Sequence, residues 1–510
     1  MGRLATLAAI VGLTLGGSPA VRRTERDLQP PIRPELLLDV ALAIEPIRSA
    51  AFLSYRREGL GEVLVTNRGA SAVDGLFVRV ELPARPDLLP EPFERRLARL
   101  EPGAVERVRI FPRFAPAVTS LPTSELTFRA VIVHCREMVA ARESLVPVAD
   151  RSSVTWDLPE RIAALIDPQA VAALVRSAVA RRSREEELSA LGNFPLASAA
   201  FDALASRGLR YLEDSPSSTA TAVLGVPVDR VNLPAETLRD RAGDCDDLAV
   251  LLASAFEALG VRGALGIFED HVIVLFESGL AVAGRDNPCI EPSEAVERDG
   301  RLWVPVEATE LARSGATLLG AWRSAQARVE ALERREARFF EVRKAWSVYP
   351  AIVTVSDRRL AEPFCGAGQA ESSTGEKSGR ELSGFLRARV GERARRARAL
   401  ADPAAPGDGD RLEAAAFAAA GLWKEAERLL RQAVALSGLP EARVELAAVL
   451  LSAPTGAADL RSVQAELETA LHELDPLDLA AQGEALKHLD RVRTLMRGSS
   501  AAPSMVGGGH

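Results

Sequence analysis

Residues 243–260 read GDCDDLAVLLASAFEALG, and this stretch decides the fold of the middle of the chain. Its leucine, phenylalanine and alanine residues recur at helical spacing on nearly every side, which is typical of a deeply buried helix. Asp244 or a neighbour can cap the start of this helix, and Gly260 can end it. We therefore expect Cys245 to lie at the N-terminus of a central helix.

The position of Cys245 has chemical consequences. Unpaired backbone N–H groups and the helix dipole favour a thiolate there, which lowers the pKa of a thiol from about 8.5. The same N–H groups can hold the oxyanion of a tetrahedral intermediate. A thiol nucleophile also needs a proton partner that later protonates the leaving amine. A small, inert, buried residue is the alternative interpretation of a lone cysteine at a helix start.

A proton partner is available on a nearby strand. The five histidines lie at positions 134, 271, 472, 488 and 510. His271 begins the apolar run 272–276, a predicted strand that should pack on the helix. Glu307 ends the next apolar run, 302–306, and can fix the tautomer of the imidazole. A strand-edge histidine is usually structural, but its combination with Cys245 favours a thiol–imidazole pair, so the candidate catalytic residues are Cys245, His271 and Glu307.

The residues around this trio resemble the bacterial transglutaminase-like superfamily. The resemblance rests on PAETL at 234–238, GDCDDLAVL at 243–251, DHV at 270–272 and WVPVEAT at 303–309. It covers about residues 160–325 and is close to exported bacterial members that carry Glu, where animal transglutaminases have Asp, before the Thr. It implies a papain-like fold, in which the nucleophile helix packs on an antiparallel sheet that carries the histidine and the acid.

The resemblance also implies roles. Cys245 would be the nucleophile, His271 the general base and then the general acid, and Glu307 the orienting carboxylate. Two features depart from the family pattern: Glu for Asp adds one methylene, and an insertion at 284–301 makes Asp286 a competing third member. Some members of the superfamily cleave peptides or amides, some transfer acyl groups, and some have lost activity.

The first residues predict export. Arg3 supplies a positive charge, Leu4–Leu15 an apolar run and Ser18–Ala20 a small-residue end, so residues 1–20 are predicted to be a signal peptide. The run is short for a membrane span, which takes about 20 residues. An uncleaved anchor and a misplaced start are the alternatives. We expect the protein to be periplasmic or extracellular, with no other integral membrane span.

Two further regions flank the thiol domain. Residues 21–35 form a proline-rich linker, and the period-two pattern at 36–155 predicts an immunoglobulin-like antiparallel β-sandwich. His134 and Cys135 follow a predicted strand there and are expected to be a strand-end pair rather than a site. The thiol domain, with its helical lead-in from Asp167-Pro168, is assigned to 156–325.

The remainder of the chain is predicted to be helical. We assign 326–400 to a long helix (beginning at Ala321 and reaching Trp346) and a flexible linker around 372–379. We assign residues 401–498 to tetratricopeptide-like helices and residues 499–510 to a disordered tail. The residues that match the repeat spacing best are Gly421, Trp423, Ala426, Leu430, Ala433, Leu436 and Pro440.

Composition excludes several classes of protein. The chain has 510 residues, 47% hydrophobic and 26% charged, which argues against disorder over the whole chain. Its net charge of −7 gives no footprint for nucleic acid. Four cysteines do not make a disulfide scaffold. No organic cofactor or metal is predicted, and the side chains of Asp244, Asp246 and Asp247 are expected to cap the helix and be solvated.

The sequence therefore predicts an exported thiol hydrolase or acyltransferase that acts on an amide bond. We favour hydrolysis because no amine-acceptor site is recognisable; the substrate would be a protein, a peptide or a cell-wall peptide. The alternative is a non-catalytic assembly or adaptor protein, in which the sandwich and repeats bind protein partners and the thiol domain is inactive. A third hypothesis is redox sensing by Cys245 with Cys289 or Cys365.

Overall fold

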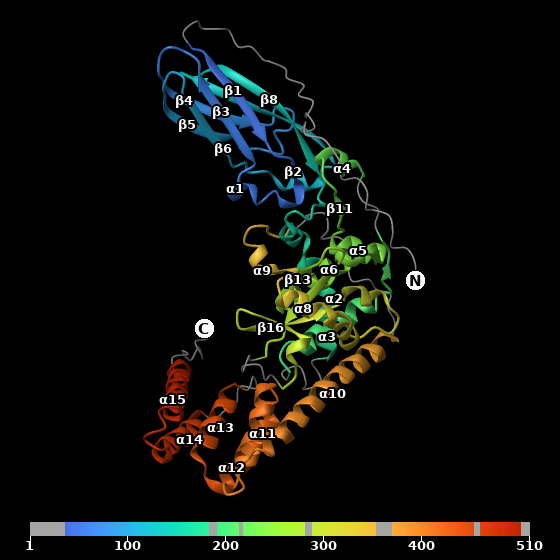
Figure 1. Cartoon of the computed structure of the whole chain (residues 1–510), viewed down its shortest axis with the longest axis vertical. Coiled ribbons are helices and arrows are strands. Elements are labelled where there is room, and N and C mark those ends of the chain that lie inside the picture. The colour runs from blue at the N-terminus through green and yellow to red at the C-terminus, as the bar shows by residue number, and fades with distance from the viewer. Residues whose placement is uncertain are drawn as a thin grey trace, which may run out of the picture. The chain divides into compact units, whose positions relative to one another are not determined.

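The chain is a multidomain α+β protein, with β-sheets in its N-terminal and central parts and a helical C-terminal region (Figure 1). A computed structural model describes residues 36–182, 191–213, 218–280, 288–352, 370–452 and 460–500. The predicted signal peptide and the 21–35 linker lie outside these ranges, as does the predicted tail beyond Ser500. The chain divides into two compact units. Unit 1 consists of Met1–Ser153 and Ser217–Pro227, and unit 2 of Val154–Pro216 and Val228–His510.

Unit 1 contains two sheets. The first is antiparallel, in the order β1 (Leu38–Ile44), β3 (Gly61–Asn67), β6 (Val105–Ile110). The second has the order β2 (Ile47–Arg48), β8 (Glu137–Ala149), β7 (Ser124–His134), β4 (Val73–Glu81), β5 (Phe93–Leu100). The predicted alternation is confirmed, since Val63 and Val65 on β3 and Val78 and Val80 on β4 are fully buried.

Two details of unit 1 bear on the sequence predictions. His134 ends β7, and Cys135 and Arg136 form the turn into β8 with positive φ angles, so the strand-end prediction is confirmed. The segment Ser217–Pro227, which the sequence assigned to the thiol domain, belongs to unit 1 instead. Its helix α4 (Ser218–Leu224) packs against β8 and buries Ala220, which accounts for the difference.

The central part of unit 2 is built on a five-stranded antiparallel sheet. Its order is β15 (Val296–Arg298), β16 (Arg301–Val306), β14 (Val272–Glu277), β13 (Gly263–Ile267), β17 (Arg338–Glu341). Helix α6 (Cys245–Ala258) packs on β14 and β13, and its residues from Leu248 to Phe256 have no exposed surface. A helix that is apolar all round must be covered on all sides, as the sequence predicted.

Two more helices cover α6. They are α2 (Pro168–Arg182) and α3 (Phe194–Ala205), and both pack against it. The predicted start at Asp167-Pro168 is confirmed, because Asp167 Oδ1 accepts a hydrogen bond from the Gln169 backbone N–H at 2.9 Å. Among the described helices none alone combines the length and hydropathy of a membrane span. A pair bent by 65°, Pro159–Leu165 with Pro168–Arg181, does so only jointly.

The single helix predicted from Ala321 to Trp346 is wrong. The structure has α7 (Leu318–Ala325), α8 (Val329–Glu333), strand β17 and α9 (Val342–Ala345) in this region. Arg335 has a φ of +60°, which is incompatible with a continuous helix. Phe340 then lies opposite Leu265 on β13, so pairing with a distant strand overrides the helical charge pattern.

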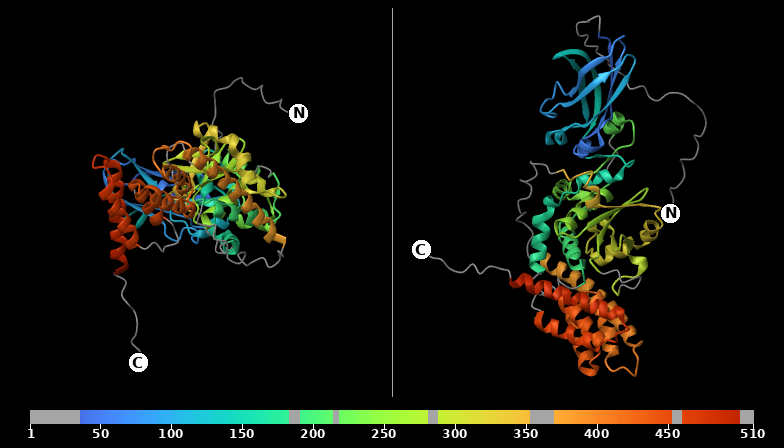
Figure 2. Two further views of the ribbon diagram at one scale, coloured as in Figure 1. Left: turned by 90° about the horizontal axis from the view of Figure 1, so that it is seen from below. Right: turned by 90° about the vertical axis from the view of Figure 1, so that its left-hand side faces the viewer.

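The C-terminal region is helical, as predicted. Its elements are α10 (Ala370–Arg398), α11 (Asp408–Ala419), α12 (Trp423–Ser437), α13 (Pro440–Ser452), α14 (Leu460–Glu473) and α15 (Leu479–Ser500). From α10 onward each helix packs against the next (Figure 2). The predicted flexible stretch around 372–379 is wrong, because these residues belong to α10. Of the repeat positions, Ala426, Leu430 and Ala433 are buried, whereas Leu436 is 62% exposed.

Helix α10 also packs against the central part of unit 2. Arg389 donates to the Glu294 carboxylate, at 2.8 Å for Nη2 and Oε1. Phe385 lies edge-on to Trp322, which is buried and donates through Nε1 to the backbone carbonyl of Glu294 at 2.8 Å. A cation–π contact of Arg389 with Phe385, 4.5 Å from the ring centroid, completes this cluster.

Candidate active site

Cys245 is the first residue of α6 and is half-buried. Asp244 precedes it as the N-cap, and its Oδ1 accepts from the Asp247 backbone N–H at 3.4 Å, so the predicted cap is confirmed. Gly243 has no room for a side chain, because an added Cβ would lie 2.6 Å from the Cβ of Asp247. The motif therefore combines a steric requirement with a cap at the start of the helix.

His271 and Glu307 meet where two neighbouring inner strands of the sheet, β14 and β16, have their start and their end. Val274 of β14 lies opposite Val306 of β16, so the residue just before β14 and the residue just after β16 are neighbours. His271 Nε2 and Glu307 Oε2 are 2.8 Å apart, and the two side chains are only 15% and 12% exposed. The structure thus brings together two of the three predicted site residues.

Glu307 is held at both of its oxygens. Its Oε1 accepts from the Thr309 hydroxyl at 2.7 Å and from the Thr309 backbone N–H at 3.2 Å. Burial raises the pKa of the Glu307 carboxyl, but hydrogen bonds from His271 and Thr309 outweigh burial and hold the pKa below its usual value. Glu307 is therefore ionised at neutral pH. Its Oε2 accepts a hydrogen bond from His271 Nε2–H, which leaves Nδ1 as the acceptor nitrogen of the neutral ring.

The thiol of Cys245 lies beside the strand that follows His271. The backbone N–H of Val272, the residue after His271, lowers the pKa of this thiol. Within the described residues, however, the thiol and the His271 ring form no hydrogen bond with each other. Catalytic hydrogen bonds are often long or misaligned without substrate and tighten when it binds. The described geometry is thus a site in which the imidazole and the carboxylate are paired and the thiol is adjacent to them.

The pKa of Cys245 departs from its ordinary value in the direction opposite to the sequence prediction. Burial and the carboxylates of Asp246 and Asp244 raise the pKa of the thiol to about 12, against a lowering by the Val272 N–H. The helix dipole contributes only about 0.3–1 kcal/mol at such a position. Burial and like charge therefore dominate, and the resting thiol is neutral.

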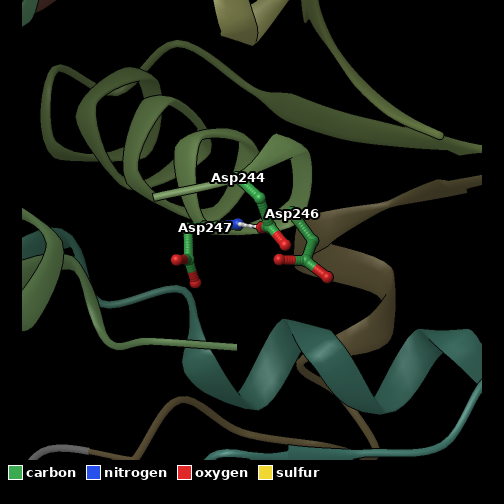
Figure 3. A group of neighbouring side chains, drawn as sticks. All are labelled: Asp244, Asp246 and Asp247. Atoms are coloured by element: carbon green, nitrogen blue, oxygen red, sulfur yellow. Dashed lines mark hydrogen bonds between the residues drawn. The ribbon is translucent and has the colours of Figure 1, made fainter. Parts of the chain in front are cut away.

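The three aspartates of the motif have different surroundings (Figure 3). Asp247 is fully buried, and its two oxygens accept from the backbone N–H of Asn232 at 2.6 Å and from its side-chain amide at 2.8 Å. Asp246 is 2% exposed and its Oδ1 has no partner among the described residues. Burial and a hydrogen bond with Asp244 raise the pKa of Asp246 to about 11. The predicted solvation of Asp246 and Asp247 is therefore wrong.

Among the described residues, these aspartates are a group that could hold a metal ion. One carboxylate oxygen from each lies within 4.8 Å of those from the other two. In Figure 3 the carboxylates of Asp244 and Asp246 lie close together, whereas that of Asp247 points away from them. Since Asn232 engages both oxygens of Asp247, only two carboxylates of the group are available as donors.

Tyr211 completes the surroundings of the nucleophile. Its strand β10 (Arg210–Tyr211) pairs in parallel with β12 (Ala242–Gly243), which places it opposite Gly243. Its side chain is 47% exposed, and burial together with the charges of Cys245 and Asp244 raises the pKa of its phenol. No role was predicted from the sequence for Tyr211 or for Thr309. The signal for Thr309 was its place two residues after Glu307.

The other thiols and the rival acid are placed as follows. Cys289 is buried, and burial raises the pKa of its thiol to about 12. Cys135 is exposed in unit 1. Cys365, and Asp286 as the competing third member, lie outside the described residues.

Comparisons with known proteins found no matching family model and no matching curated protein. What can be inferred about chemistry therefore depends on the side chains of this site and on the motifs around them. The contact between His271 and Glu307 is the strongest feature available.

Proposed function

We propose that the chain is a thiol hydrolase or acyltransferase of the transglutaminase-like type, which cleaves or transfers at an amide bond. The observation that carries this proposal is the 2.8 Å contact between His271 and Glu307, beside the strand whose Val272 N–H lowers the pKa of the Cys245 thiol. A nucleophile, a base and an orienting acid in this order are the minimum set for acyl transfer through a thioester.

The arrangement of elements supports the finer fold assignments within the same proposal. A buried helix that begins at the nucleophile and packs on an antiparallel sheet fits a papain-like domain. Two sheets with alternating burial fit an immunoglobulin-like sandwich in unit 1. Helices that pack successively from α11 to α15 fit a tetratricopeptide-like region.

The proposed mechanism begins with attack of Cys245 Sγ on the substrate carbonyl. His271 Nδ1 takes the thiol proton, and the Glu307 carboxylate stabilises the imidazolium that forms. Backbone N–H groups at the start of α6 would hold the oxyanion. The imidazolium then protonates the leaving amine, and water or a second amine resolves the thioester. We favour water as the acceptor.

The raised pKa of Cys245 defines when the thiolate forms. Because the resting thiol is neutral, we do not expect a preformed thiolate–imidazolium pair. Substrate that displaces water and brings the imidazole to the thiol would allow proton transfer and carbon–sulfur bond formation to occur together. This mechanism makes activity strongly dependent on His271.

The proposed substrates are proteins, peptides or cell-wall peptides outside the cytoplasm. The predicted signal peptide supports a periplasmic or extracellular location. The C-terminal helices, of which α10 packs against α3 and α7, are a proposed surface for a protein partner.

The decisive experiment is a substrate screen with a matched pair of cysteine variants. The full chain would be incubated with peptide and cell-wall peptide libraries, and released amines and new carboxylates would be measured by mass spectrometry. Cys245→Ala should abolish turnover, whereas Cys135→Ala, in an exposed turn of unit 1, should retain it. Full turnover by Cys245→Ala would rule out the proposed nucleophile.

A non-catalytic adaptor remains the second candidate. Two observations favour it: the raised pKa of Cys245, and the missing hydrogen bond between its thiol and His271 in the described structure. Under this hypothesis the site is a retained scaffold, and the helices of unit 2 or the sheets of unit 1 bind partners. A Cys245 that stays inert toward iodoacetamide and toward every library would favour the adaptor.

A further inference from the structure

We propose that Thr309 is a positioning residue, which orients the Glu307 carboxylate so that one oxygen faces His271. The inference rests on the proposed function and adds a fourth residue to the site. Thr309 contacts neither the thiol nor the imidazole in the recorded hydrogen bonds of the described chain, so it acts through Glu307.

The proposal rests on the different partners of the two carboxylate oxygens of Glu307. Thr309 donates twice to Oε1, from its hydroxyl at 2.7 Å and from its backbone N–H at 3.2 Å. His271 Nε2 is paired with Oε2 at 2.8 Å. Two donors from one residue define the plane of the carboxylate as well as its position. A carboxylate held in this way has one oxygen left for the imidazole.

Glutamate needs such a restraint more than aspartate does. Its side chain has one additional rotatable bond, and immobilising a long polar side chain costs about 1.5–2 kcal/mol of conformational entropy. The Thr309 contacts hold the carboxylate before substrate arrives, so this entropy is not lost at each turnover. Thr309 therefore compensates for the extra methylene that distinguishes this site from one with aspartate.

The segment that carries Thr309 is itself anchored to the nucleophile helix. Thr309 belongs to a short 3-10 helix, η5 (Ala308–Ala312), which begins with Glu307 as its cap and packs against α6. The next residue, Glu310, is buried and accepts from the Ser324 hydroxyl of α7 at 2.8 Å. The backbone N–H of Glu307 donates to the carbonyl of Ala321, also on α7, at 3.1 Å. These contacts set η5 in place beside the helix that begins at Cys245.

A purely structural role is the competing explanation. Glu307 is the cap of η5, so the bond from the Thr309 N–H also stabilises a helix start. A role confined to capping would lower stability without changing the tautomer of His271. The two explanations therefore predict different pH profiles and different coupling with Glu307.

The test uses the full chain and two probes of the site. Iodoacetamide alkylation of Cys245 between about pH 7 and 12, quantified by mass spectrometry, measures access to the thiolate. Nitrogen NMR of His271 measures its tautomer. We expect Thr309→Val to slow alkylation about tenfold, the effect of losing one hydrogen bond to a charged group, and to mix the His271 tautomers. Thr309→Ser, which keeps the hydroxyl, should restore both readouts.

Thr317→Val is the matched control. Thr317 caps α7, where its hydroxyl oxygen accepts from the Gly320 N–H at 3.1 Å, and it has no bond to Glu307. This variant should lower thermal stability without changing the alkylation profile or the tautomer of His271. An equal change of the profile in Thr317→Val would mean that Thr309 acts only by stabilising a helix.

Coupling with Glu307 distinguishes the failure of this inference from the failure of the proposed function. In a Glu307→Ala background, Thr309→Val should cause no further loss of alkylation rate, because Thr309 acts only through the Glu307 carboxylate. If Thr309→Val behaves like the wild type while alkylation is slowed in Glu307→Ala and in His271→Ala, only the role of Thr309 is overturned. Unchanged alkylation in His271→Ala would overturn the proposed function itself.

Discussion

His271 and Glu307 are 36 residues apart in sequence, and their side chains meet at 2.8 Å because the strands beside them are hydrogen-bonded neighbours. The start of β14 and the end of β16 lie at the same sheet edge, so sheet register alone brings the two residues together. A glutamate at this position reaches the imidazole while its other oxygen stays on Thr309.

Shortening the acid should break this contact. In Glu307→Asp the carboxylate is withdrawn by one methylene while the backbone remains fixed by the Ala321 carbonyl. It then cannot reach both His271 and Thr309. We expect at least a tenfold loss in kcat with little change in KM, since an orienting contact worth about 1.5–3 kcal/mol is lost. Steady-state kinetics on any substrate from the screen would measure this, and an unchanged kcat would contradict the assigned role.

The titration of Cys245 should lie at high pH. Burial and nearby carboxylates raise the pKa of the thiol, so the pH profile of iodoacetamide alkylation should have its midpoint well above the ordinary value of about 8.5. Asp244→Asn keeps an N-cap side chain but removes one of the charges that raise this pKa, and it should move the midpoint downward. A wild-type midpoint below 8.5 would instead support the helix-dipole expectation and a preformed ion pair.

Glu307 should titrate below the ordinary range of glutamate. Its folded-state pKa is lowered, so it contributes stability that is fully present above the unfolded value of about 4.3. That stability is lost as the pH falls through the lower, folded-state pKa. Carboxyl carbon NMR with glutamate labelling, assigned with Glu307→Gln, would give the midpoint. A midpoint above 4.3 would mean that burial outweighs the bonds from His271 and Thr309.

Gly243→Ala should destabilise the protein. The new Cβ would lie 2.6 Å from the Asp247 Cβ, so either backbone or a buried carboxylate must move, at a cost of about 1–3 kcal/mol. Gly384→Ala is the matched control, because Gly384 lies within α10 with nothing near its Cβ position. It should be neutral or stabilise by up to about 1 kcal/mol. Urea unfolding of both variants would test the contrast, and equal stabilities would contradict it.

The local elements of the site could be predicted from the sequence because their signals are local. The apolar spacing after Cys245 and the Asp244 cap define α6, and the apolar runs after His271 and before Glu307 define two strands. Charge and polarity were less informative. The pattern from Ala321 to Trp346 is helical by sequence, yet Phe340 pairs with a strand that lies far away in the chain.

The electrostatics of the nucleophile could not be predicted, for a physical reason. The dipole of a helix lowers the pKa of a thiol at its N-terminus by a modest amount. Burial raises the pKa of a thiol, and how far Cys245 is buried depends on the whole fold. The partner of Asp247, Asn232, is 15 residues away in sequence, and no helix or strand periodicity relates the two. The sequence therefore suggested solvated aspartates where the structure buries Asp246 and Asp247.

The tight contact of Gly243 with Asp247 has a consequence for how related chains can diverge. Position 243 could gain a side chain only after position 247 had lost bulk, and that loss would leave both donors of Asn232 without their carboxylate. Each single step on this path is costly, so the pair is expected to change slowly whether or not catalysis is under selection. In a descendant chain, retention of Gly243 and Asp247 would indicate an intact helix start, whereas retention of His271 would indicate surviving chemistry.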